Sequence, residues 1–64
     1  MLRTVDEVIE KLGGTQRAAE VAAVLPSAVS NWRKREKIPS DRFFVIGEAL
    51  RAVSAEADPA IFGF

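Results

Sequence analysis

The sequence predicts an all-α domain of four short helices followed by a short apolar tail. Three observations lead to this prediction. Apolar residues recur at helical spacing in separate segments, and residues that start or end helices lie between those segments. The third is length, because 64 residues are enough for one small domain and include no linker long enough to divide it. A core of this size gives little stability beyond the entropy cost of ordering the chain, so a partner chain would help.

The first helix is expected from Thr4 to about Leu12. Thr4 and Glu7 have the capping-box spacing, in which each side chain accepts a hydrogen bond from a free backbone amide at the helix start. Apolar residues at positions 5, 8, 9 and 12 then follow the i, i+3, i+4, i+7 pattern, and a pair of glycines ends the helix. The acidic residues lie off this stripe, so a solvated face is expected rather than a catalytic carboxylate pair.

Two further short helices are expected, at residues 16 to about 23 and from about Pro26 to Arg35. Thr15 is a candidate N-cap for the first of them, whose alanines permit close approach to a neighbouring helix. Proline disfavours helical geometry at the residue before it and suits the first turn of a new helix. Val29 and Trp32 lie one turn apart, so this spacing predicts that both belong to the core and that Trp32 is not a stacking platform for single-stranded nucleic acid.

The fourth helix is expected to begin at Ser40 or the residue before it, after the interruption at Lys37-Ile38-Pro39. Its apolar stripe consists of Phe43, Ile46, Leu50 and Val53. Gly47 lies beside this stripe, where another backbone is expected to come close. The helical pattern fails after Ser54, so the sequence predicts a domain at residues 1–54 and a tail at residues 55–64.

Composition excludes several classes of chemistry. The chain has no cysteine and no histidine, which removes disulfides, Cys/His zinc sites and every Ser-His or Cys-His nucleophile. No catalytic residue, metal ligand, cofactor or small-molecule ligand is therefore expected, and an enzyme is the weakest hypothesis. No apolar run approaches the roughly 20 residues that span a bilayer, and the N-terminal segment is too charged for a signal peptide. A soluble cytoplasmic protein without membrane contact is expected.

Charge is balanced overall but not locally. Nine Lys and Arg residues face nine Asp and Glu residues. Residues 15–42 nevertheless carry six cations against three anions, a local excess of three. Most of these cations follow the small polar residues of the third helix, and Lys34 falls with those residues opposite the apolar side. The alternative is that this basic run is only a solvated helix end, because cations favour a helix C-terminus.

Two short helices with a tight break, the second presenting small polar residues, are what a helix-turn-helix requires. The segment TQRAAEVAAVLPSAVSNW, residues 15–32, resembles the helix-turn-helix of Cro-like phage repressors. Trp32 followed by Ile38-Pro39 resembles small Cro-like regulators of prophages and bacterial chromosomes. Three core positions of the family motif are matched, by Ala19, Val29 and Trp32. The usual glycine of the turn is replaced by Ala23.

The resemblance covers residues 4–54 and implies a Cro- or lambda-repressor-like four-helix fold that binds double-stranded DNA. It places the base-reading residues in the N-terminal half of the third helix, at Ser27, Ala28, Ser30 and Asn31. The chemistry independently agrees, because an asparagine can pair with adenine N6 and N7, a serine can donate or accept, and an alanine methyl can meet a thymine methyl. The alternatives are that Ser27 only caps the helix and that Asn31 is only hydrated.

Phosphate contacts are expected from two places. One is the start of the second helix, where free amides, a positive helix end and a cation come together. The other is the basic end of the third helix and the residues after it, although Arg33 has the alternative of pairing with an acid such as Glu36. The expected phosphate-contacting residues are Thr15, Gln16, Arg17, Arg33, Lys34, Arg35 and Lys37.

The sequence therefore predicts a sequence-specific DNA-binding transcriptional regulator that reads a palindromic operator through the major groove as a homodimer. A repressor is expected because the chain has no room for a ligand domain or an activation surface. The tail is expected to make the dimer, since its apolar residues are not used by the helical stripes. The expected dimer residues are Phe44, Ile61, Phe62 and Phe64. Two alternatives remain: a tail that folds back over its own core, and a protein-interaction module such as an antitoxin-like or co-regulator partner.

Overall fold

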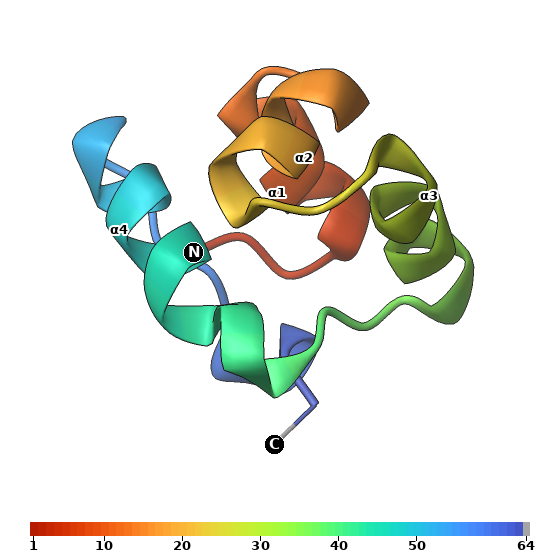
Figure 1. Ribbon diagram of the computed structural model, residues 1–64. Helices are drawn as coiled ribbons and strands as arrows, with labels where there is room; N and C mark the ends of the chain where they lie inside the picture. The colour runs from red at the N-terminus through yellow and green to blue at the C-terminus, as the bar shows by residue number, and fades with distance from the viewer. Residues whose placement is uncertain (64) are drawn as a thin grey trace.

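The structure is a computed structural model that describes residues 1–63, and Figure 1 shows it as an all-α domain. Within those residues it contains four α-helices and no β-strand, which confirms the predicted fold class. The helices are α1 (Val5–Leu12), α2 (Thr15–Ala22), α3 (Pro26–Arg35) and α4 (Phe43–Ala52). Short 3-10 turns at Ser40–Arg42 and Pro59–Ile61 complete the regular structure of the described residues. Phe64, which is expected to contribute to the dimer contact, lies outside the described residues.

Helix α1 begins with the predicted capping box. The Thr4 hydroxyl accepts a hydrogen bond from the Glu7 amide at 3.1 Å. Glu7 Oε1 in turn accepts from the Thr4 amide at 3.0 Å and from the Arg3 amide at 2.9 Å. Gly13 ends the helix in the left-handed region, with φ of 108°, as glycine does most readily.

The break between α2 and α3 uses an alanine where a glycine would be unstrained. Ala23 follows α2 with φ of 59°, and Val24 donates back to the Ala19 carbonyl at 3.0 Å. Thr15 does not cap α2, which corrects the expectation: it is already helical, and the N-cap is Gly14 with φ of 103°. A cap in that backbone region requires glycine, so the capping position shifts by one residue.

Helix α3 has the predicted bounds. Pro26 is its first residue, after Leu25 in extended backbone. Val29 and Trp32 are both buried in the core, which confirms their assignment and leaves no exposed indole for stacking on bases. Among the described residues, α2 and α3 form the most extensive contact between two helices, and the buried alanines of α2 allow that close approach.

Helix α4 differs from the expectation in its start and its apolar stripe. The segment from Ser40 is a 3-10 turn, and the α-helix begins at Phe43. Ile46 and Leu50 are buried as expected, whereas Phe43 and Val53 at the two ends are exposed. A Cβ added to Gly47 would meet nothing within 4 Å, so the expectation of a close backbone there is wrong.

The C-terminal segment folds back over the core of its own domain. The sequence left this arrangement open as the alternative to a tail that forms the dimer. Ile61 is 4% exposed and Phe62 is 1% exposed. The Ile38 amide donates to the Ile61 carbonyl at 2.8 Å, and the Gly63 amide donates to the Ile38 carbonyl at 3.1 Å. Figure 1 shows this blue segment beside the green linker that joins α3 to α4. The assignment of Ile61 and Phe62 to a dimer contact is therefore wrong, because neither side chain is accessible to a partner.

The segment before residue 61 is held in the same way. The Leu2 amide donates to the Glu56 carbonyl at 2.7 Å, and the Asp58 amide donates to the Leu2 carbonyl at 2.8 Å. The Phe62 ring meets the Phe43 ring edge to face, with centroids 5.0 Å apart. Residues 55–63 are thus part of the packed domain and not a separate appendage.

The capping box predicts an acid-dependent loss of stability. The pKa of the Glu7 carboxyl lies below its usual 4.5, mainly because the Arg3 amide donates a hydrogen bond to the carboxylate. Partial desolvation acts in the opposite direction and raises the pKa. Hydrogen bonds from the Thr4 amide and hydroxyl lower it further. A lowered folded-state pKa means that the stabilisation is present above the unfolded-state pKa and is lost as pH falls through the lower value. We expect Glu7→Gln to melt below the wild type at neutral pH, with the difference shrinking below pH 4.5.

Circular dichroism melts of both proteins across this pH range measure the difference. The matched control is Glu36→Gln, because the Glu36 side chain makes no hydrogen bond or ion pair within residues 1–63. A gap between Glu7→Gln and the wild type that stays constant into acid would contradict the assignment.

The left-handed alanine predicts a stabilising substitution. An L-residue in the left-handed region destabilises the folded state by roughly 1–2 kcal/mol. Substitution by glycine removes this strain, but the greater freedom of glycine in the unfolded chain reduces the gain in stability by about 0.4–1 kcal/mol. We expect Ala23→Gly to stabilise the domain by about 0.5–1 kcal/mol, which is a rise of roughly 4 °C in Tm for a chain of this size. The adjacent Ala22→Gly is the control, because Ala22 is helical and buried, and this change should lower Tm. Equal losses in both variants would show that Ala23 is not strained.

Candidate nucleic-acid interface

The exposed side of α3 presents the expected base-reading residues. Ser27, Ser30 and Asn31 are exposed, whereas Ala28 is half-buried between this side and the core. Ser30 and Asn31 lie three and four positions after Ser27, which places both on the same side of the helix as Ser27. None of their side chains makes a hydrogen bond within residues 1–63, so their donors and acceptors remain available to a ligand. Ser27 does not cap α3, because the N-cap is Leu25 and makes no side-chain cap.

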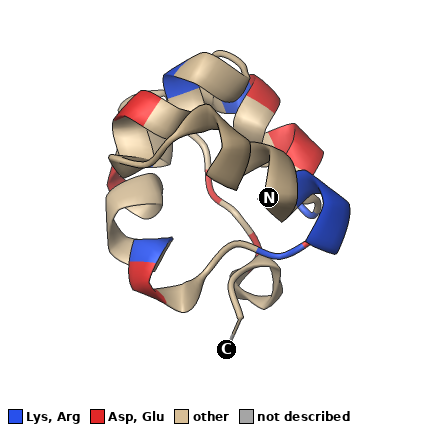
Figure 2. Ribbon diagram, turned by 45° about the vertical axis from the view of Figure 1, so that its right-hand side comes forward, with Lys and Arg blue, Asp and Glu red and all other residues tan. Residues whose placement is uncertain are grey.

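Cations gather at the C-terminal end of α3 and in the linker after it, as Figure 2 shows. Lys34 and Arg35 are exposed and form no ion pair within the described part of the chain. Lys34 lies four residues after Ser30 and three after Asn31, so it continues the same face. This arrangement places free positive charge at the end of a row of small polar side chains.

Arg33 lies on a different side of α3 from these two cations. Its guanidinium pairs with Asp6 at 3.1 Å and with Glu10 at 3.5 Å, so it joins α3 to α1. Its side chain is 32% exposed, and its Nε atom is buried without a hydrogen-bond partner. The structure thus places Arg33 in the contact between α1 and α3, and its expected phosphate contact stays a prediction. The partner acid is not Glu36, the residue considered from the sequence.

Lys37 is likewise engaged within the domain. Its Nζ atom donates to the Ala60 carbonyl at 2.7 Å. This bond lies next to the backbone pairing of Ile38 with the C-terminal segment, so it fastens that segment to the linker. Lys37 is exposed despite this bond, and its expected phosphate contact stays a prediction.

The start of α2 keeps most of its predicted features. Gln16 and Arg17 are exposed, and Thr15 is half-buried. The cap of α2 provides no side-chain hydrogen bond, so amides of the first turn are open to an anion. Arg17 pairs with Glu20 at 3.1 Å, but both side chains are 66% exposed, and such pairs contribute only about 0–1 kcal/mol. A phosphate can therefore replace Glu20 at little cost.

Sequence reasoning missed two features. The first is the pairing of Asp6 and Glu10 with Arg33; their i, i+4 spacing on the polar side of α1 and a cation near the packed side of α3 were the available signals. The second is a hollow beside Phe44 on α4, which depends on where residues 55–62 lie and has no local sequence signal. Phe44 itself is 77% exposed, and its assignment to a dimer contact stays a prediction.

Comparisons with known proteins leave the surface of α3 as the main guide to function. No family model matches the chain, and no curated protein or solved structure matches it. Within residues 1–63, no helix combines the length and apolarity needed to cross a membrane. In the same residues, no group of three or more His, Cys, Asp or Glu side chains is placed to hold a metal ion.

Proposed function

We propose that the protein is a sequence-specific regulator of transcription, a repressor, that binds double-stranded DNA as a dimer and reads a palindromic operator in the major groove. The observation that carries this proposal is the exposed face of α3. It combines small polar side chains without protein partners and unpaired cations at its end. The resemblance of residues 15–32 to Cro-like repressors supports the same assignment.

The dimensions of α3 suit this role. A ten-residue helix is about 15 Å long and about 10–12 Å across, and the major groove of B-DNA is about 12 Å wide. Small side chains at Ser27 and Ser30 allow the helix to approach the base edges, whereas long ones would hold it away. The buried side of α3 and the ion pairs of Arg33 fix the helix in the domain, so that little ordering is required on binding.

Charge determines how much of the affinity is specific. The chain has zero formal net charge, so long-range attraction to DNA is weak. The cations that remain free for phosphates are Lys34 and Arg35, with Arg17 available by exchange. Binding then depends on base contacts and on a second subunit more than it does in a strongly basic protein. Occupation of an operator is itself enough to exclude other proteins from the same DNA, which is why we propose repression.

Selection of bound duplexes from a random pool by the purified protein tests the proposal directly. Enrichment of a palindrome would support DNA reading and two-fold symmetry together. The second candidate function is a protein-interaction module, which the exposed Phe44 favours. A pool without any enriched sequence would contradict the DNA-binding proposal and favour that second function.

Asn31 provides the sharpest test of base reading. We expect Asn31→Ala to weaken binding to the selected operator by about 1–3 kcal/mol, which is the cost of one lost bidentate base contact. Binding to an unrelated duplex should change little, because phosphate contacts remain. Fluorescence anisotropy with both duplexes measures the two affinities. An equal loss on both would mean that Asn31 does not read a base.

Lys34 and Arg33 form a matched pair for testing phosphate contacts. Both are cations on adjacent residues of α3, but only Arg33 is paired with acids of α1. We expect Lys34→Met to reduce the slope of log affinity against log salt by about one unit. Arg33→Met should leave the slope nearly unchanged and lower Tm instead. Equal slopes for Lys34→Met and the wild type would refute a phosphate contact of Lys34.

A further inference from the structure

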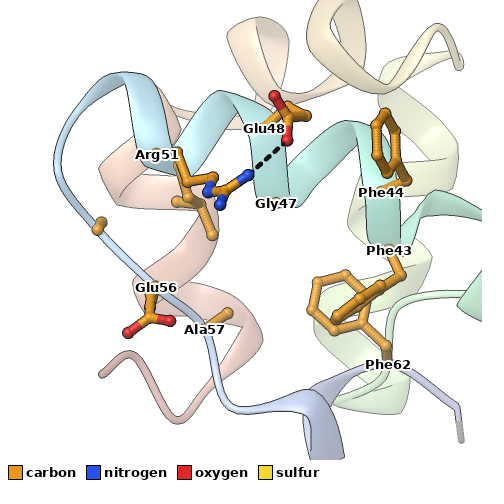
Figure 3. Close-up of a pocket in the computed structure, with 10 residues that line it drawn as sticks. Phe43, Phe44, Gly47, Glu48, Arg51, Glu56, Ala57 and Phe62 are labelled. Carbon is orange, nitrogen blue, oxygen red and sulfur yellow. Dashed lines mark hydrogen bonds and ion pairs between the residues drawn. The ribbon is translucent and has the colours of Figure 1, made fainter.

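Helix α4 leaves a hydrophobic side chain exposed beside a hollow. Phe44 is 77% exposed, and the neighbouring hollow has a volume of about 280 Å³. Figure 3 shows the rings of Phe43 and Phe62 on one side of this hollow and Arg51 and Glu56 on the other. We call this feature the α4 hollow. It is formed by α4 together with the returning C-terminal segment, so it exists only because that segment is packed against the domain.

The size and origin of the α4 hollow indicate what it can hold. Gly47 lies on its wall, and because a Cβ there would meet nothing within 4 Å, the space is open and not filled by a neighbour. Pockets for drug-sized ligands measure about 300–1,000 Å³, so about 280 Å³ is at the lower limit of that range. A single large side chain from another protein surface is a better match than a cofactor.

We propose that a second copy of this chain covers the α4 hollow, with the Phe44 ring of each subunit entering the hollow of the other across a two-fold axis. A two-fold interface joins the same patch on both subunits, so the patch must be complementary to itself. This patch meets that requirement, because it carries both a protruding aromatic ring and a cavity next to it. This contact specifies how the dimer of the proposed function forms. Self-association through the α4 hollow does not require DNA binding, and only the effect on operator affinity rests on the proposed function.

The charges around the α4 hollow also suit contact between identical copies. Glu48 and Arg51 pair at 2.9 Å on its rim, and their side chains are 52% and 75% exposed. Across a two-fold axis, Arg51 of one subunit can exchange partners and meet the partner's Glu48. Glu56 adds a second carboxylate to the lining, so the patch carries two anions and one cation. The exchanged pairs between Glu48 and Arg51 would offset the repulsion between the Glu56 carboxylates of two copies.

The contact is small, and this sets the conditions of the experiment. A standard interface buries about 800 Å² on each partner, which is more than one face of a ten-residue helix provides. Self-association in solution is therefore expected to be weak. Sedimentation equilibrium of the full chain without DNA, from about 10 μM to about 1 mM, covers the range of such transient complexes.

The first variant is Phe44→Glu. Because Phe44 is mostly exposed, the variant should keep the Tm of the wild type while its dimer dissociation constant rises by at least about tenfold. Leu25→Glu is the matched control, since Leu25 is a similarly exposed hydrophobic residue, 73% exposed, and does not line the α4 hollow. A wild type that stays monomeric throughout, or equal association of wild type and Phe44→Glu, overturns the proposal.

Two further variants test the cavity and the symmetry separately. Gly47→Leu fills the hollow without a clash at the Cβ and with better helix propensity, so it should fold and lose dimerisation. Glu48→Arg and Arg51→Glu each place like charges together, and an equimolar mixture of the two should associate more tightly than either alone. If the mixture shows no gain, the two-fold pairing is wrong.

Failure of this inference is distinguishable from failure of DNA binding. Self-association is measured without DNA, and half-site binding is measured with a duplex too short for two subunits. Phe44→Glu should retain wild-type affinity for such a half-site duplex and lose at least about tenfold on the full palindrome. Equal affinity of both proteins for the palindrome would overturn the role of the α4 hollow on the operator.

Discussion

The burial of Ile61 and Phe62 in the core is the interaction on which the rest of the structure depends. A domain this small has few residues to exclude water from its centre, and 13 hydrophobic residues of residues 1–63 form the buried cluster. Phe62 is among the largest of these, and its backbone pairs with Ile38 between α3 and α4. The same segment therefore fills the core and fixes the linker that sets the direction of α4. It also forms one wall of the α4 hollow, so core packing and the proposed subunit contact have a common origin.

Packing divides the basic residues into two groups with different roles. Arg33 and Lys37 face other parts of the domain and are used there, by the acids of α1 and by the Ala60 carbonyl. Lys34 and Arg35 face outward and have no partner in the described residues. A run of four cations in five residues thus contributes only half of its charge to a free surface. Charge counted along the sequence overstates the free basic surface because ion pairs with α1 engage Arg33 and a hydrogen bond to the Ala60 carbonyl engages Lys37.

Local signals predicted the helices, and tertiary contacts produced the differences. The capping box at Thr4, the start of α3 at Pro26 and the core position of Trp32 each depend on residues a few positions apart, and all three are confirmed. The C-terminal segment has no helical period, and its place beside Ile38 follows from contacts distant in sequence. Local sequence patterns therefore could not predict that this segment is buried, or that Ile61 and Phe62 are inaccessible to a second subunit. The α3 surface was accessible to such a reading because helical spacing alone separates its buried and exposed sides.

The proposed dimer and the proposed base contacts are energetically dependent on each other. A neutral domain that makes few phosphate contacts binds one half-site weakly, and a contact limited to one face of α4 joins two subunits weakly. On a palindrome the two half-sites lie about 34 Å apart, and the first bound subunit raises the local concentration of the second. The affinities then combine, so that the full operator is occupied while isolated half-sites remain empty. Weak individual contacts are in this view the source of discrimination, because only DNA that satisfies both half-sites and the two-fold contact at once is bound tightly.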